Sequence, residues 1–185
     1  EEIYKKENIK KMDVNMPLFM FGFKDNFNKE RLESGYEKDN REVVKYDVAL
    51  QIALELIAGK STKLFEDLYS EGLVTREFGL GFTYEEDYAY TSFDNESSNY
   101  NEVLKENGLD EEDFERAKKM LYGNFVKGFN DVSRIATMVI SDYFKGINSF
   151  DYVESYKQID KAYVEEVIRK HFDFDKMALS VIEPA

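Results

Sequence analysis

The chain has 185 residues, 43% of them apolar, a composition that excludes a disordered protein and provides the core of a single domain over residues 1–185. Its 38 acidic and 25 basic residues give a net charge of −13, so phosphate backbones are repelled and nucleic acid is excluded as a partner. The absence of cysteine excludes disulfides and fits a cytoplasmic protein, and no apolar run reaches the roughly 20 residues of a membrane span.

The first third of the chain predicts a strand and a long helix. Residues 1–15 are polar and lead into Met16 to Lys24, whose apolar side chains on both faces predict a strand covered on both sides. A charged segment follows over residues 25–40. Helical spacing of apolar residues then predicts a deeply buried helix from Arg41 to Ala58.

The next segment, Gly59 to Val74, has the pattern of a helix end, a sharp turn and a short capped helix. Gly59 is expected to take the left-handed conformation that ends the long helix. Ser61 is expected to cap the short helix by accepting a hydrogen bond from a free N–H group. Leu64, Phe65 and Leu68 share one face of this helix, and Gly72 ends it.

The second half predicts two strands, a run of helices and a final strand. Alternating apolar residues indicate strands over 78–84 and 87–93, joined by a hairpin connection at 85–87 and followed by a polar, turn-rich segment over 94–101. Helices are expected over 111–129 after Asp110, up to Gly146 after Asn130 or Asp131, over about 149–156, and after Asp160. A last strand is expected over 176–182. This order predicts an α+β fold with a mostly antiparallel sheet and helices packed on one face.

Several segments resemble, in shared order and spacing, the pitrilysin/insulinase family of zinc metallopeptidases. They are the segment 59–74, the entry strand 16–23, the helix starts 112–118 and 159–167, and the final strand 181–184. The sequence from Leu68 to Leu73 is similar to the corresponding segment of bacterial processing proteases of this family. The resemblance implies the second, non-zinc domain of one family half. It also implies three partners: an upstream zinc-bearing domain, a second half or subunit, and a peptide substrate.

The chain has no zinc motif of its own. The family holds zinc with His-x-x-Glu-His and a distal Glu, and the Glu of the motif activates water. Catalytic zinc takes two or three histidines, and His171 is the only histidine present. We therefore expect no catalytic residue, no metal ligand and no cofactor in this chain, with zinc in the first domain of the parent protein. At the end of a predicted helix, a positively charged His171 would favour the helix dipole.

The same resemblance points to candidate substrate-facing residues. Many family halves that lie opposite the zinc carry an Arg after the Leu-Phe helix and a Tyr after the Gly-Leu exit, and both contact substrate. At these places the chain has Tyr69 and Thr75, and Arg76 lies one residue beyond. The candidate substrate-facing residues are therefore Tyr69, Thr75 and Arg76. The alternative for Arg76 is an ordinary surface arginine without a role in binding.

Two functions stay open, because a fold does not by itself imply a function. The first is a structural and substrate-chamber domain of a zinc-dependent metalloendopeptidase, not catalytic by itself. The alternative is a domain of an inactive partner subunit or a protein-interaction module on the same fold. Compared with the usual crossover length, about a dozen residues are absent between Phe93 and Gly108, so residues 94–107 mark a deletion or a missing segment.

Overall fold

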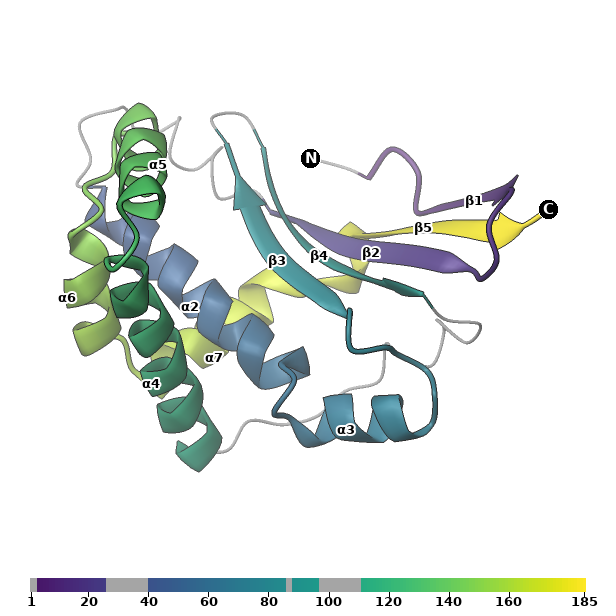
Figure 1. Cartoon of the computed structure of the whole chain (residues 1–185), viewed down its shortest axis with the longest axis horizontal. Helices are drawn as coiled ribbons and strands as arrows, with labels where there is room; N and C mark the ends of the chain where they lie inside the picture. Colours follow the sequence, from purple (N-terminus) through teal and green to yellow (C-terminus); the bar gives the residue numbers. More distant parts are fainter. Residues whose placement is uncertain (1–2, 26–39, 86–87, 97–110) are drawn as a thin grey trace.

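The computed structural model describes residues 3–25, 40–85, 88–96 and 111–185. Within them, five strands form one mixed sheet with the order β1-β5-β2-β4-β3 (Figure 1). The strands are β1 (Glu7–Met12), β2 (Leu18–Asp25), β3 (Gly79–Tyr84), β4 (Ala89–Glu96) and β5 (Met177–Pro184). Only β1 and β5 pair in parallel, and every other neighbouring pair is antiparallel. This topology confirms the α+β fold with a mostly antiparallel sheet.

The predicted helices are present, with boundaries that differ by a few residues. They are α2 (Arg41–Ala58), α3 (Lys63–Ser70), α4 (Glu111–Gly128), α5 (Val132–Phe144), α6 (Asp151–Gln158), α7 (Lys161–His171) and the short 3-10 helix η2 (Phe174–Lys176). Asp131 caps α5 by accepting from the N–H groups of Ser133 and Arg134, and Asp160 caps α7 in the same way. Asp110 lies outside the described residues. None of the described helices is long and apolar enough to cross a bilayer.

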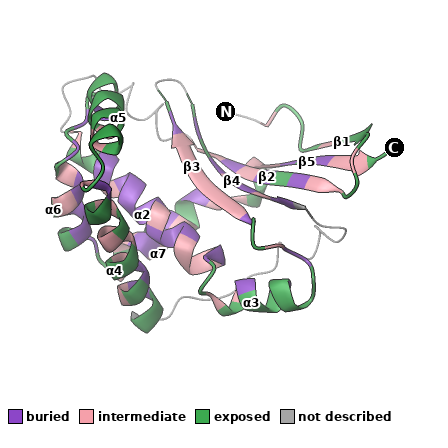
Figure 2. Ribbon diagram, viewed as in Figure 1, coloured by how far each residue is buried: buried purple, intermediate pink, exposed green. Residues whose placement is uncertain are grey.

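Helix α2 is the centre of the larger hydrophobic core, and Figure 2 shows it buried along most of its length. Val44, Val48 and Leu50 are completely enclosed. Three other helices supply buried partners in the same core. These are Phe114 and Ala117 of α4, Tyr152 and Tyr156 of α6, and Val164 and Val167 of α7. The all-round apolar pattern of α2 is therefore satisfied by helices on several sides.

A second core fills the space between the sheet and the end of α2. Phe19, Phe21 and Phe23 of β2 all point to this inner face, and the Phe21 ring stacks on Phe93 of β4 with centroids 4.7 Å apart. The helices cover these rings with four buried side chains. They are Leu54 and Ala58 of α2 and Phe65 and Leu68 of α3. The inner face of the sheet thus carries the helices, as the fold class predicts.

Three strand predictions were wrong in part. Residues 7–12 form the edge strand β1, which has mostly exposed side chains and hence no apolar alternation to reveal it. Strand β2 is covered on one face only, since Met20 on the other face is half exposed. Strand β4 continues to Glu96, so residues 94–96 are paired with β2 and are not a turn. The missing segment near 94–107 otherwise lies outside the described residues.

The turn between α2 and α3 also differs from the prediction. Gly59 has φ −62° and not a left-handed conformation, but a Cβ there would collide with the carbonyl oxygen of Glu55, so a close backbone approach requires the glycine. Thr62 and not Ser61 caps α3, with its Oγ1 accepting from the N–H of Phe65 at 3.1 Å. Gly72 does take the left-handed conformation, with φ +72°.

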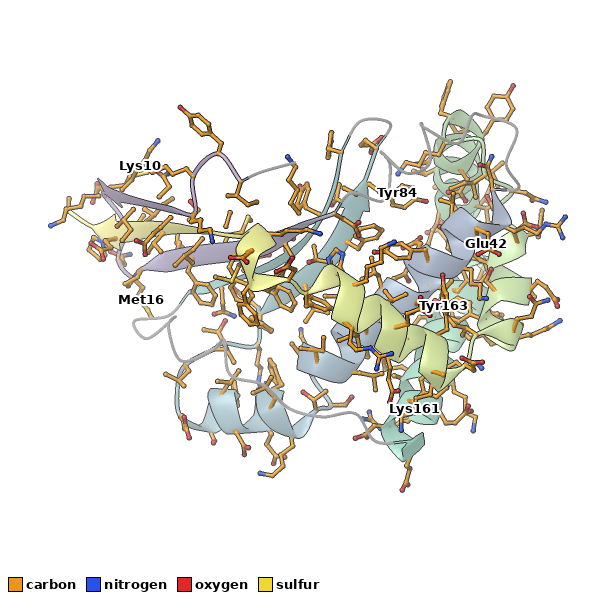
Figure 3. All side chains as sticks on the ribbon, turned by 180° about the vertical axis from the view of Figure 1, so that it is seen from behind. Lys10, Met16, Glu42, Tyr84, Lys161 and Tyr163 are labelled. Carbon is orange, nitrogen blue, oxygen red and sulfur yellow. The ribbon has the colours of Figure 1, made fainter. Side chains whose placement is uncertain are left out.

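A buried carboxyl group lies inside the helical core. Tyr152 donates its hydroxyl to Asp47 Oδ2 at 2.6 Å, and Gln51 donates to Oδ1 at 2.9 Å. Burial raises the pKa of Asp47 above its ordinary value, and these two hydrogen bonds oppose the rise only in part. Burial also raises the pKa of Tyr152, with the Asp47 charge adding to it. In Figure 3, Tyr84 at the end of β3 lies towards this core, whereas Lys10 and Met16 lie at the far end of the sheet.

Leu50→Ala is expected to lower the free energy of unfolding by about 2–5 kcal/mol, because it leaves a cavity beneath a completely buried side chain. Urea unfolding followed by circular dichroism measures the change. The control is Glu42→Ala on the exposed side of the same helix, which should cost less than about 1 kcal/mol. Equal losses in the two variants would contradict the central place of α2.

Asp47→Asn is expected to change how stability depends on pH. A raised folded-state pKa means that Asp47 contributes stability below its ordinary pKa of 3.8, and that this contribution is lost as pH rises through the folded-state value. Relative to the variant, the wild-type chain should therefore lose stability between acidic and neutral pH in urea titrations. Asp67→Asn, which changes an exposed carboxyl on α3, should run parallel to the wild type. A constant difference for Asp47→Asn would refute the assignment.

Candidate functional site

Helix α3 and the segment that follows it lie beneath the sheet (Figure 1). Phe65 and Leu68 anchor α3 in the second core, so the opposite face of the helix is left to solvent. After Gly72 the chain turns back, and the N–H of Leu73 donates to the carbonyl of Leu68 at 2.8 Å. This turn brings the residues that follow α3 next to its last turn.

The structure brings two of the three candidates together. Arg76 Nε donates to the hydroxyl of Tyr69 at 3.2 Å, and the guanidinium carbon lies 5.8 Å from the centre of the Tyr69 ring. The Tyr69 ring in turn stacks on Phe65 at 6.0 Å. Tyr69 is 42% exposed and Arg76 is exposed, so the pair presents an aromatic face and a cation to solvent.

The third candidate has a different environment. Thr75 is half-buried, and its N–H donates to Oδ1 of the buried Asn95 at 3.1 Å. Its hydroxyl oxygen accepts from the N–H of Glu77 at 3.2 Å. Thr75 therefore holds the turn in place and positions Arg76. Asn95 was missed because it lies in the segment that the polar composition assigned to a turn.

His171 lies at the end of α7, as predicted, but it is buried in a chain of hydrogen bonds. Its Nδ1 is 2.6 Å from Asp25 Oδ2, and its Nε2 is 2.9 Å from Thr91 Oγ1. Tyr46 donates its hydroxyl to the same oxygen of Asp25 at 2.6 Å. The expectation of a simple interaction with the helix dipole was incomplete, because these contacts tie α7 to α2, β2 and β4.

The described residues do not fit a catalytic zinc ion. Both ring nitrogens of His171 have partners, and its side chain is fully buried. Across residues 3–25, 40–85, 88–96 and 111–185, no group of three or more His, Cys, Asp or Glu side chains is placed to hold a metal. Catalytic zinc needs three protein ligands and an open fourth position, which this arrangement does not offer.

The comparisons with known proteins agree with the resemblance drawn from the sequence. No family model matches the chain. In sequence it is 26% identical over 193 residues to the uncharacterised zinc protease YmfH of Bacillus subtilis (strain 168), a match that covers 100% of this chain and 43% of that protein. The chain thus spans less than half the length of this relative.

Solved structures match the fold over 97–100% of the chain. A crystal structure from Alicyclobacillus acidocaldarius, described as an M16-like peptidase, has a TM-score of 0.82 at 18% identity and covers 97% of this chain and 44% of that one. A peptidase M16 inactive domain from Pseudomonas fluorescens has a TM-score of 0.73 at 14% identity, covering 100% and 45%. At such identities these structures show the fold alone. Sequence and fold together confirm that the chain resembles a non-zinc domain of pitrilysin/insulinase-type zinc peptidases.

Proposed function

We propose that this chain is a structural and substrate-chamber domain of a zinc-dependent metalloendopeptidase and is not catalytic by itself. The observation that carries the proposal is the match of the entire chain to less than half of a zinc protease. A domain that occupies only part of such an enzyme needs no catalytic group, and the burial of the sole histidine, His171, supports this role. Zinc then belongs to the first domain of the parent protein.

The Tyr69–Arg76 pair is the proposed contact with peptide substrate, with Thr75 as the residue that positions it. A guanidinium binds carbonyl and carboxylate oxygens through several N–H donors. Only Nε of Arg76 bonds to a described residue, so its terminal nitrogens face solvent without a partner among the residues that the structure describes. The stacked Phe65 and Tyr69 rings limit the movement of the pair.

The second candidate is a domain of an inactive partner subunit, or an interaction module on the same fold. It stays open because the exchange of residue types at the α3 exit is compatible with both contexts, a half that follows a zinc-bearing domain or an inactive partner subunit. Tyr69 stands where family halves opposite the zinc carry an Arg, and Thr75 stands where they carry a Tyr. The extent of the domain over residues 1–185 and a cytoplasmic location stay predictions.

The coding sequence upstream of this segment distinguishes the two functions. The proposed function requires a His-x-x-Glu-His motif within about 200 residues, one domain length, before Glu1. The 185-residue chain alone should bind no stoichiometric zinc in equilibrium dialysis and should hydrolyse no peptide. Absence of the motif would favour the inactive subunit, and tight binding of one zinc ion per chain would overturn both assignments.

Arg76→Ala in the complete protease is expected to lower kcat/KM for peptide hydrolysis by about 10–100-fold, mainly through a higher KM. The size follows from the loss of a hydrogen bond to a charged group, worth about 1.5–3 kcal/mol. Lys63→Ala is the matched control, because Lys63 is an exposed cation on α3 whose ion pair with Asp67 lies at the surface. A change of less than twofold for Arg76→Ala would remove the pair from the substrate site.

A further inference from the structure

Helix α5 carries an exposed apolar face. Six residues along one side of the helix form this α5 face: Val132, Ala136, Val139, Ile140, Tyr143 and Phe144. Their spacing is that of a core-facing stripe, yet Val132, Tyr143 and Phe144 are 81%, 77% and 82% exposed. Figure 2 shows α5 mainly in the colour of exposed residues, in contrast to the buried α2. The sequence pattern predicted this helix correctly, but the described residues do not cover its apolar side.

Hydrogen bonds link the C-terminal end of α5 to the loop that follows it and to β3. Asp142 is buried and accepts a hydrogen bond from Ser149 Oγ at 2.6 Å, while its carbonyl accepts from the N–H of Ile147 at 2.8 Å. Lys145, directly after the helix, donates to the carbonyl of Tyr84 at 2.9 Å. The end of α5 that carries Tyr143 and Phe144 is therefore attached to the following loop and to the end of β3.

The composition and size of the face are those of a protein interface. Between Val132 and Phe144 only Arg134 and Asp142 are charged, in a chain where 34% of residues are. Interface cores are depleted in charge and enriched in aromatic residues. A side chain such as Tyr143 or Phe144 buries about 150–250 Å². With the four aliphatic residues, the face approaches the roughly 800 Å² that each partner contributes to a standard interface.

Two other occupants fit poorly. A helix that lies on a membrane surface has a polar side rich in Lys and Arg, but α5 has a single basic residue, Arg134, in a chain of net charge −13. A second copy of the chain would bring two such negative charges together, which opposes association. A further part of the same polypeptide carries neither objection. The zinc protease that the whole chain matches is more than twice as long, since the match covers 43% of it.

We propose that the α5 face is the surface on which another domain of the same longer polypeptide docks, an inference that rests on the proposed function for the existence of that domain. The contact would bury Tyr143 and Phe144 at its centre, where aromatic side chains contribute most to binding. Helix α5 and helix α3, which carries Tyr69, lie on different parts of the molecule (Figure 1), so docking on α5 leaves the candidate substrate contact open.

Hydroxyl-radical footprinting of the complete gene product and of the 185-residue chain tests the proposal. Oxidation of Tyr143 and Phe144 is expected to fall at least tenfold in the complete product. Phe174, an exposed aromatic residue of η2, should change less than twofold. Unchanged oxidation of Tyr143 and Phe144, a complete product without a further domain, or equal protection by a dimer of the isolated chain would overturn the proposal. A further domain without the zinc motif would refute the proposed function alone.

The double variant Tyr143→Asp with Phe144→Asp provides a second measurement. In the 185-residue chain it should shift Tm by less than about 4 °C, because exposed substitutions change stability by about 0.5 kcal/mol each. In the complete product it should free the docked domain and speed limited proteolysis between the domains at least tenfold. Tyr4→Asp, at a fully exposed tyrosine, should leave this rate unchanged. Equal proteolysis rates for the double variant and the wild type would count against docking on α5.

Discussion

Helix α2 is enclosed on most of its sides, with Val44, Val48 and Leu50 completely removed from solvent, and the other elements are arranged around it. Complete burial of one such side chain contributes about 1.5–3 kcal/mol, so a helix without a polar side is stable only inside a shell. The sheet supplies one wall of that shell, and α4, α6 and α7 supply the others. The C-terminal part of α2 also reaches the second core, where Leu54 and Ala58 pack with Phe65 and Leu68 of α3.

Two buried polar clusters fix how the helices pack against the sheet and against one another. His171 joins Asp25 and Thr91 where α7 meets the sheet, and Asp47 joins Tyr152 and Gln51 between α2 and α6. A buried polar group without a partner costs more than a normal hydrogen bond contributes, so each cluster disfavours shifted packings. Thr91 and Asp47 are themselves buried, so both clusters lie in the interior.

The buried groups of the molecule therefore differ from the groups that it exposes to solvent. Asp47 and Tyr152, whose pKa values are raised by burial, belong to the interior. Its outward features are the Tyr69–Arg76 pair and the uncharged α5 face, which lie on different helices. This distribution agrees with the proposed structural role, because a fold does not by itself imply a function.

The sequence by itself determined the helices, the order of the longer strands and the fold class, because apolar periodicity and caps such as Asp131 and Asp160 are local signals. It also indicated Tyr69 and Arg76, but not that they touch, since the turn after Gly72 sets that distance. Strand β1 escaped prediction because an edge strand with charged side chains gains its stability from pairing with β5, which lies at the other end of the chain. Only the tertiary structure decided that His171 is buried and that the α5 face is exposed. Burial depends on which distant elements pack against a stripe, and helical spacing is the same whether the partner lies within the domain or outside it.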